Sequence, residues 1–172
     1  VTRDLTSSLD LPRVLQKALT ELMAATTAEA GAIYLTDDAV ENIVPSTRIN
    51  WHEKEISTRT LPSPWQMGRD EPVFHFEELA ASDEGAWVKD LADPAISTML
   101  VGPLVANGQF RGVMALGSVD GDAFSADFFQ LFQNVLSQVA TGIGNADVYR
   151  MISQQAQELG LMFRQQQQQA TE

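Results

Sequence analysis

Side chains that could hold a small ligand gather between residues 57 and 101. Trp65 and Trp87 could stack on a planar molecule, and His75, between Phe74 and Phe76, could donate a hydrogen bond to a ligand carbonyl. Apolar walls with a few polar groups are typical of small-molecule pockets. The residues that we expect to line such a pocket are Arg59, Trp65, His75, Phe76, Trp87, Ser97 and Met99.

The same residues also have ordinary structural interpretations. A partly buried histidine is often satisfied by the backbone, and aromatic side chains in a covering segment often belong to the core. Arg59, Arg69 and Arg111 could pair with a carboxylate or a phosphate, but exposed ion pairs are the default for arginines in an acidic chain. Two hypotheses stay open: a pocket that binds a small molecule, and a pocket filled by the protein's own Trp and Phe side chains.

No group of residues predicts catalysis or a metal site. The chain has no cysteine, which excludes a thiol nucleophile, a thiolate zinc site and a thioether-linked cofactor. Nothing matches a nucleophile elbow, a phosphate loop or a zinc-protease helix. Asp120-Gly121-Asp122 lacks the glutamate of a calcium loop and is interpreted as a turn, and His52-Glu53 with His75 are too few for a metal. We expect no enzyme and no metal.

Composition limits the partners of the chain. Its 172 residues suffice for one domain with its own core, and its net charge of −12 would repel nucleic acids and anionic membranes. No apolar run approaches the ~20 residues of a membrane span, and the absence of cysteine fits a reducing, cytoplasmic compartment. Because the sequence starts at Val1 within a helical pattern, we expect a piece of a longer protein.

The first third of the chain predicts a helix and then three strands. Asp10 can cap a helix that tolerates Pro12 in its first turn, has apolar residues at helical spacing, and should end at Gly31. Short β-rich runs follow. They predict strands at residues 32–36, within 41–50, and at about 56–61.

Residues 62–98 follow no single period and combine four prolines with several aromatic residues. A segment this long and this aromatic is more typical of a binding or covering segment than of a linker. Short helices are predicted at residues 77–81 and 85–91.

Residues 99–117 predict an antiparallel hairpin around the Asn107-Gly108 turn. Its flanks are apolar at nearly every position, so both faces should be covered: one by the two terminal helices, the other by residues 62–98. Pro103 cannot donate to a ladder, so we expect a bulge or a local edge there.

A long helix should begin at the cap Ser125 and continue toward the glutamines at 165–169. Gly142 and Gly144 should let Ala18, Ala24 or Ala25 of the first helix approach closely. The second half would project from the domain with an apolar stripe, which a second copy of the chain could cover. That stripe consists of Val148, Ile152, Leu159 and Met162. Alternatively, residues after about 150 fray.

Several segments together resemble a GAF domain, a regulatory module of sensor kinases, phosphodiesterases, cyclases and phytochromes. They are a helix, the strand Gly31-Ala32-Ile33-Tyr34-Leu35, a variable middle, the hairpin with Gly112-Val113-Met114-Ala115-Leu116-Gly117-Ser118, and a helix with Gln138-Val139-Ala140 and Asn145-Ala146. The similarity spans roughly residues 5–150. It implies an α+β fold: a central antiparallel sheet of five or six strands, terminal helices on one face, and a ligand pocket or its vestige on the other.

Departures from the family pattern reduce the number of ligand classes that this chain could bind. Cyclic-nucleotide-binding members carry Asn-Lys after the hairpin, where this chain has Gly117-Ser118, and their aspartate position holds Phe128. Bilin-carrying members and the methionine-sulfoxide reductases of the family need cysteine, which this chain lacks. The ligand therefore stays unidentified.

We interpret residues 1–150 as a GAF-like sensory or regulatory domain and residues 151–172 as a helical extension toward a missing output domain. The protein would be a non-catalytic homodimer, for example a fragment of a histidine kinase or cyclase. It would bind a small molecule and relay the change through its terminal helices, or act as a ligand-free dimerisation relay.

Overall fold

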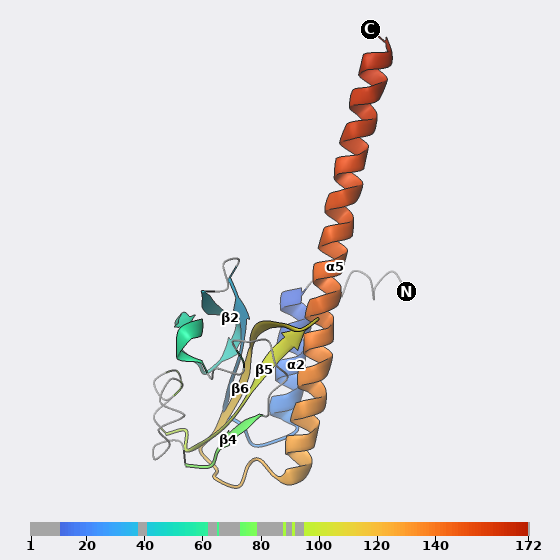
Figure 1. Ribbon diagram of the computed structural model, residues 1–172. Helices are drawn as coiled ribbons and strands as arrows, with labels where there is room; N and C mark the ends of the chain where they lie inside the picture. Colours follow the sequence, from blue (N-terminus) through green and yellow to red (C-terminus); the bar gives the residue numbers. More distant parts are fainter. Residues whose placement is uncertain are drawn as a thin grey trace.

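A computed structural model describes residues 11–37, 41–61, 65, 73–78, 88, 91 and 95–171. In this part of the chain a six-stranded antiparallel sheet, ordered β3-β2-β1-β6-β5-β4, packs against two helices (Figure 1). This arrangement confirms the expected α+β fold. The elements are α2 Leu11–Ala24, β1 Ala30–Thr36, β2 Asn42–Ile49, β3 Ile56–Ser57, the 3-10 turn η1 Thr58–Thr60, β4 Phe74–Phe76, β5 Thr98–Ala106, β6 Gln109–Ser118 and α5 Ala126–Thr171.

Helix α2 packs on the sheet through three leucines at helical spacing, Leu15, Leu19 and Leu22, all buried. It ends at Ala24, so the expectation that Gly31 terminates it is wrong: Gly31 is the second residue of β1. A Cβ at Gly31 would lie 2.9 Å from Leu19 Cδ1. The glycine therefore lets the helix lie close against the strand.

The strands at residues 30–36 and 42–49 match their predictions, but the third strand is shorter than expected. It contains only Ile56 and Ser57, and residues 58–60 form a 3-10 turn instead of continuing it. The Ser57 side chain caps that turn by accepting a hydrogen bond from the Arg59 amide at 3.3 Å. Local capping thus replaces strand pairing there.

The β5–β6 hairpin is buried on both faces, as predicted. Asn107 and Gly108 have positive φ values of 54° and 75°, which the tight turn requires. Alternate residues belong to two separate clusters. Leu100, Leu104, Met114 and Leu116 face the helices, and we call this side the helix face. Met99, Val101, Val113 and Ala115 point to the opposite side, which we call the front face.

Pro103 lies at a local edge of β5, in agreement with the prediction. Among the described residues, β4 pairs with β5 only at Met99 to Val101, and the β5–β6 register shifts between Leu104 and Val105. The missing amide donor of Pro103 therefore falls beyond the β4 pairing.

Helix α5 begins after Ser125, whose Oγ accepts a hydrogen bond from the Phe128 amide at 3.2 Å, confirming the predicted cap. Its first half buries Phe128, Phe132, Val139 and Ile143 against the helix face. The helix has 46 residues, about 70 Å at 1.5 Å per residue, and its second half projects well beyond the sheet (Figure 1).

Gly142 and Gly144 of α5 do not make room for the first helix, so that expectation is wrong. A Cβ at Gly142 would meet nothing within 4 Å, whereas one at Gly144 would lie 3.3 Å from Asn107 Nδ2 and 3.5 Å from Ala106 Cβ. Gly144 therefore faces the tip of the hairpin.

Residues from the irregular middle segment cover the front face, as predicted. Trp65, Val88, Leu91 and Ile96 are buried in the same cluster as the front-face strand residues. The two short helices predicted at 77–81 and 85–91 fall largely outside the described residues; Glu77 and Glu78 form a turn. No helix in the described part of the chain has the length and apolarity to cross a bilayer.

Candidate functional site

The front face carries most of the aromatic residues expected at a ligand site. Trp65 is fully buried, and its ring centroid lies 5.4 Å from that of Phe74, which stacks on Phe76 at 5.8 Å. Phe76 and Met99 are buried in the same cluster. The structure therefore brings together Trp65, Phe76 and Met99 of the predicted set.

A buried polar pair that the sequence did not reveal lies on the same face. Trp51 Nε1 donates a hydrogen bond of 2.8 Å to the Tyr34 hydroxyl, and the two residues are 3% and 1% exposed. Burial raises the pKa of Tyr34, against smaller opposing effects of the Trp51 hydrogen bond and the Arg48 charge. The sequence features that could have indicated this pair are a tyrosine within an apolar strand and a tryptophan just after the next strand.

The covering segment is hydrogen-bonded to the chain beside this pair. The His52 amide donates to the Leu91 carbonyl at 2.7 Å, and Arg48 Nη1 donates to the Trp51 carbonyl at 2.8 Å. Tyr34 and Trp51 therefore lie next to a point where the cover is fixed to the sheet.

Other predicted residues lie elsewhere. Arg59 lies on η1, where it is exposed and does not belong to the buried cluster. Trp87 and Arg69 are outside the described residues. His75 and Ser97 do not join the front-face cluster but line a separate cleft.

That cleft has a volume of about 980 Å³ near the start of α5. His75 Nε2 lies 3.2 Å from Thr98 Oγ1, which itself donates to the Phe76 carbonyl at 3.2 Å. Because a threonine hydroxyl has one proton, Nε2 of His75 must be the donor. The His75 ring also meets Phe124 edge-on at 5.8 Å. The remaining lining residues are Glu77, Glu78, Ser97, Gly121, Asp122 and Ser125.

The acidic groups near this cleft do not form a metal site. Among the residues that the structure describes, no three His, Asp or Glu side chains lie close enough together to hold an ion. Asp120 and Asp122 form a turn in which the Asp122 amide donates to Asp120 Oδ1 at 3.0 Å. This local bond is the pattern of an Asx turn.

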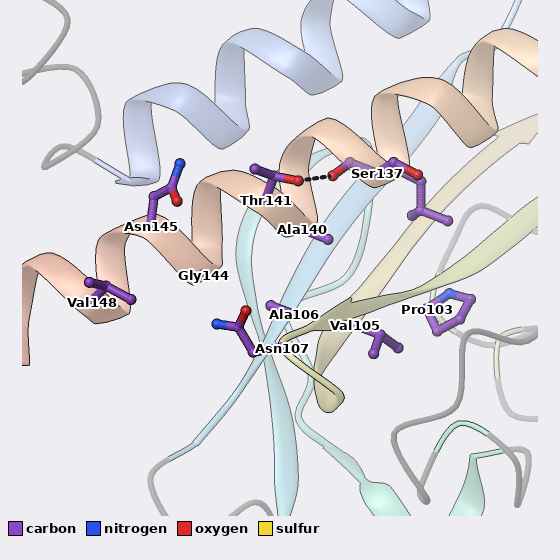
Figure 2. Close-up of a pocket in the computed structure, with 11 residues that line it drawn as sticks. Pro103, Val105, Ala106, Asn107, Ser137, Ala140, Thr141, Gly144, Asn145 and Val148 are labelled. Atoms are coloured by element: carbon purple, nitrogen blue, oxygen red, sulfur yellow. Dashed lines mark hydrogen bonds between the residues drawn. The ribbon is translucent and has the colours of Figure 1, made fainter.

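A groove of about 360 Å³ separates the end of β5 from α5 (Figure 2). Pro103, Val105 and Ala106 line one side, and residues of α5 from Leu136 to Val148 line the other. Figure 2 shows Asn107 at the hairpin tip opposite Gly144, and the hydrogen bond of 2.9 Å from Thr141 Oγ1 to the Ser137 carbonyl. Asn107, Gly144 and Val148 also line the groove, so it includes the hairpin tip.

An ion-pair network fixes α5 to β6 at the same level. Arg111 of β6 and Arg150 of α5 both pair with the Asp147 carboxylate, and the Arg111 and Asp147 side chains are each about one-quarter exposed. Burial lowers the pKa of Arg111, and the nearby charge of Arg150 adds to that effect. Of the two interpretations offered for Arg111, the ion pair is the one observed.

Beyond this junction α5 exposes its apolar stripe. Val148, Ile152, Leu159 and Met162 are between 48% and 66% exposed, and Met151 and Phe163 are similarly open. A helix that exposes this much apolar surface is unusual unless another helix or protein covers it.

Comparison with known proteins places the chain in a family. The GAF domain family profile matches residues 8–143. No curated protein sequence matches the chain significantly.

Solved structures share the fold at low sequence identity. The GAF domain of a phosphoenolpyruvate-protein phosphotransferase from Coxiella burnetii superposes with a TM-score of 0.69 at 14% identity, covering 87% of this chain and 94% of that one. A GAF domain/HD domain protein from Geobacter sulfurreducens gives 0.64 at 16% identity, covering 84% and 98%. Because the family profile spans most of the sequence, this chain belongs to the GAF domain family.

Proposed function

We propose that the chain is a non-catalytic regulatory GAF module of a larger, cytoplasmic signalling protein. A small molecule on the front face would bias the arrangement of α5 within a homodimer. The observation that carries the proposal is the position of the β5–β6 hairpin, which is buried on both faces and contacts α5 at its tip. Residues 1–150 would form the sensing domain, and residues 151–172 would lead to the output domain.

The hairpin supplies a physical link between the two faces. Met99 and Leu100 are neighbours in β5 but belong to opposite clusters, so a shift of one side chain displaces the strand that carries the other. Contacts between Asn107 and Gly144, and between Arg111 and Asp147, lie where α5 leaves the domain. A ligand that prefers one hairpin position would thereby prefer one position of α5.

The projecting half of α5 supports self-association. Val148, Ile152, Leu159 and Met162 recur at steps of three and four, interrupted by Gln155, and all four are exposed. The charged residues nearby, Arg150, Glu158 and Arg164, lie off this stripe by helical spacing. A second α5 with the same stripe would remove these side chains from water.

Structural neighbours are consistent with this role. They include residues 122 to 287 of a methyl-accepting chemotaxis protein and a domain of a putative two-component sensor histidine kinase from Sinorhizobium meliloti. Each is part of a larger signalling protein, which supports a covalently attached output domain here. The identities, 14% and 15%, support no closer transfer of function.

Oligomeric state tests the self-association. Ile152→Asp places a charge in the stripe, so we expect the dimer to dissociate at least tenfold more readily by sedimentation equilibrium, because a charge buried between helices is costly. Gln157→Asp is the matched control, because residue 157 is exposed on another side of the same helix. A wild-type monomer at high concentration, or equal dissociation of both variants, would contradict the proposal.

A ligand-free relay is the second candidate. The Trp65, Phe74 and Phe76 rings pack on one another and Trp65 is fully buried, which favours a front face filled by the protein itself. Native mass spectrometry separates the two candidates. A dimer with an added small-molecule mass supports the sensor, and a dimer of bare chain mass in every preparation supports the relay.

A further inference from the structure

The projecting half of α5 carries a seven-residue repeat that includes one polar residue. Five exposed residues follow one another at steps of four, three, four and three: Val148, Ile152, Gln155, Leu159 and Met162. We call this row, the apolar stripe together with Gln155, the seam. Ile152 and Leu159 take position a of a coiled-coil heptad, and the other three residues take position d. Gln155 is therefore a polar layer inside an otherwise apolar seam.

The rest of the same helix segment favours a second copy of α5 as the partner. Arg150, Gln157 and Arg164 lie seven residues apart at the position that faces away from the seam, and all three are exposed. Between residues 149 and 163 the positions that flank the seam hold one charge, Glu158. Two copies would therefore meet little like-charge repulsion along this segment, although the whole chain has a net charge of −12.

The apolar seam residues do not by themselves select one arrangement of helices. An isoleucine at position a, as in Ile152, favours two strands, whereas Leu159 at a and the β-branched Val148 at d favour larger bundles. A polar residue in the seam does select an arrangement, because a buried polar side chain must find a hydrogen-bond partner. The amide of Gln155 supplies both a donor and an acceptor.

We propose that Gln155 hydrogen-bonds to Gln155 of a second copy inside a parallel, two-stranded coiled coil, and that this contact fixes the register and the number of helices. The inference rests on the proposed homodimer and names the residue that determines its geometry. In a parallel, in-register pair the two side chains meet, so the amide nitrogen of one donates to the carbonyl oxygen of the other. A shift by one heptad, or an antiparallel pairing, would place each Gln155 against an apolar seam residue and leave a buried amide unpaired.

Gln155→Leu tests the inference by sedimentation equilibrium of the full chain. The leucine completes the apolar seam, so we expect roughly tenfold or more tighter association. Because the polar layer is lost, species larger than a dimer should also form, whereas the wild type should stop at the dimer. Gln157→Leu is the matched control, because it makes the same substitution two residues away on the exposed opposite side and should change neither quantity.

Double electron–electron resonance reports the register in the same variants. The chain has no cysteine, and a Cβ at Gly160 would meet nothing within 4 Å, so Gly160→Cys provides a single site for a spin label. We expect one narrow distance in the otherwise wild-type dimer and in Gln157→Leu, and several distances in Gln155→Leu. Gln155→Asn keeps an amide in the seam, so it should retain the narrow distance and the dimer.

The outcomes separate this inference from the proposed function. An added mass or a broadened distance that only Gln155→Leu produces supports the inference. A wild-type dimer in which Gln155→Leu changes neither quantity, in which Gln157→Leu has the same effect, or in which Gln155→Asn behaves like Gln155→Leu would refute the role of Gln155 alone. A wild-type monomer would refute the homodimer, and this inference with it.

Discussion

Tyr34 is the residue at which burial and hydrogen bonding are most closely coupled. Its hydroxyl is enclosed by apolar side chains and accepts a hydrogen bond from Trp51. Burial disfavours the charged phenolate, which is why its pKa is raised from the ordinary value of 10.0. The folded state therefore holds the Tyr34 proton more tightly than the unfolded chain does.

Stability should depend on pH through this residue. Because the folded pKa is the higher one, the contribution is fully present below pH 10 and is lost as pH rises through the folded value. We expect the free energy of unfolding to fall above about pH 10 in the wild type and to fall less steeply in Tyr34→Phe. Urea titrations from pH 8 to 11 measure both slopes; parallel slopes would mean that Tyr34 is not desolvated.

Residue-level contacts of this kind could not be predicted from the sequence. The periodicity of residues 32–36 indicates that Tyr34 alternates with Ile33 across a strand, but it does not identify Trp51 as the partner. The same holds for Gly144: its helical position was evident, yet its contact with Asn107 depends on how the hairpin tip meets the helix. Spacing predicts faces, and partners across the sheet follow from topology.

At the scale of elements, short sequence patterns were sufficient to predict turns, caps and strands that depend only on neighbouring residues. The Asn107-Gly108 turn, the Ser125 cap and the alternating strand of residues 42–49 all form as predicted. The third strand was overestimated because residues 58–60 form a 3-10 turn, in which Ser57 accepts hydrogen bonds from the Arg59 amide and the Thr60 hydroxyl. Residues 62–98 showed no period because their buried members, such as Trp65 and Leu91, are spaced to meet the sheet rather than one another.

The junction between β6 and α5 is the element contact that the relay most requires. Asp147→Asn removes the carboxylate shared by Arg111 and Arg150 and leaves the Arg111 side chain, which is about one-quarter exposed, without its counterion. We expect a loss of about 1–2 kcal/mol in stability and faster amide hydrogen exchange in α5 from about residue 144 onward. Glu158→Gln, on the exposed half of the same helix, is the control and should change neither quantity. Unchanged exchange in Asp147→Asn would remove the junction from the relay.

At the scale of the whole molecule, α2 and the first half of α5 cover one face of the sheet, and buried residues such as Trp65 and Leu91 pack on the other. The second half of α5 extends far beyond the sheet (Figure 1). The sandwich and the long helix were both predicted, because two apolar hairpin faces and an uninterrupted helical sequence leave few other arrangements. The residues predicted to line a ligand pocket were brought together only in part: Trp65, Phe76 and Met99 lie in one cluster, whereas His75 and Ser97 line another cleft. A shift of the β4 register by one residue would turn each of its side chains to the opposite face, and sequence alone does not set that register.

The measurement that tests the account most directly is the distance between two copies of α5. The chain has no cysteine, so Gln157→Cys provides a single site for a spin label. Double electron–electron resonance should show a narrow inter-label distance on the order of 20–40 Å, as expected for paired helices. Adding Met99→Ala, which opens a cavity on the front face far from the label, should displace or broaden that distance while the protein stays folded. No dipolar signal, or identical distributions with and without Met99→Ala, would contradict a relay from the front face to α5.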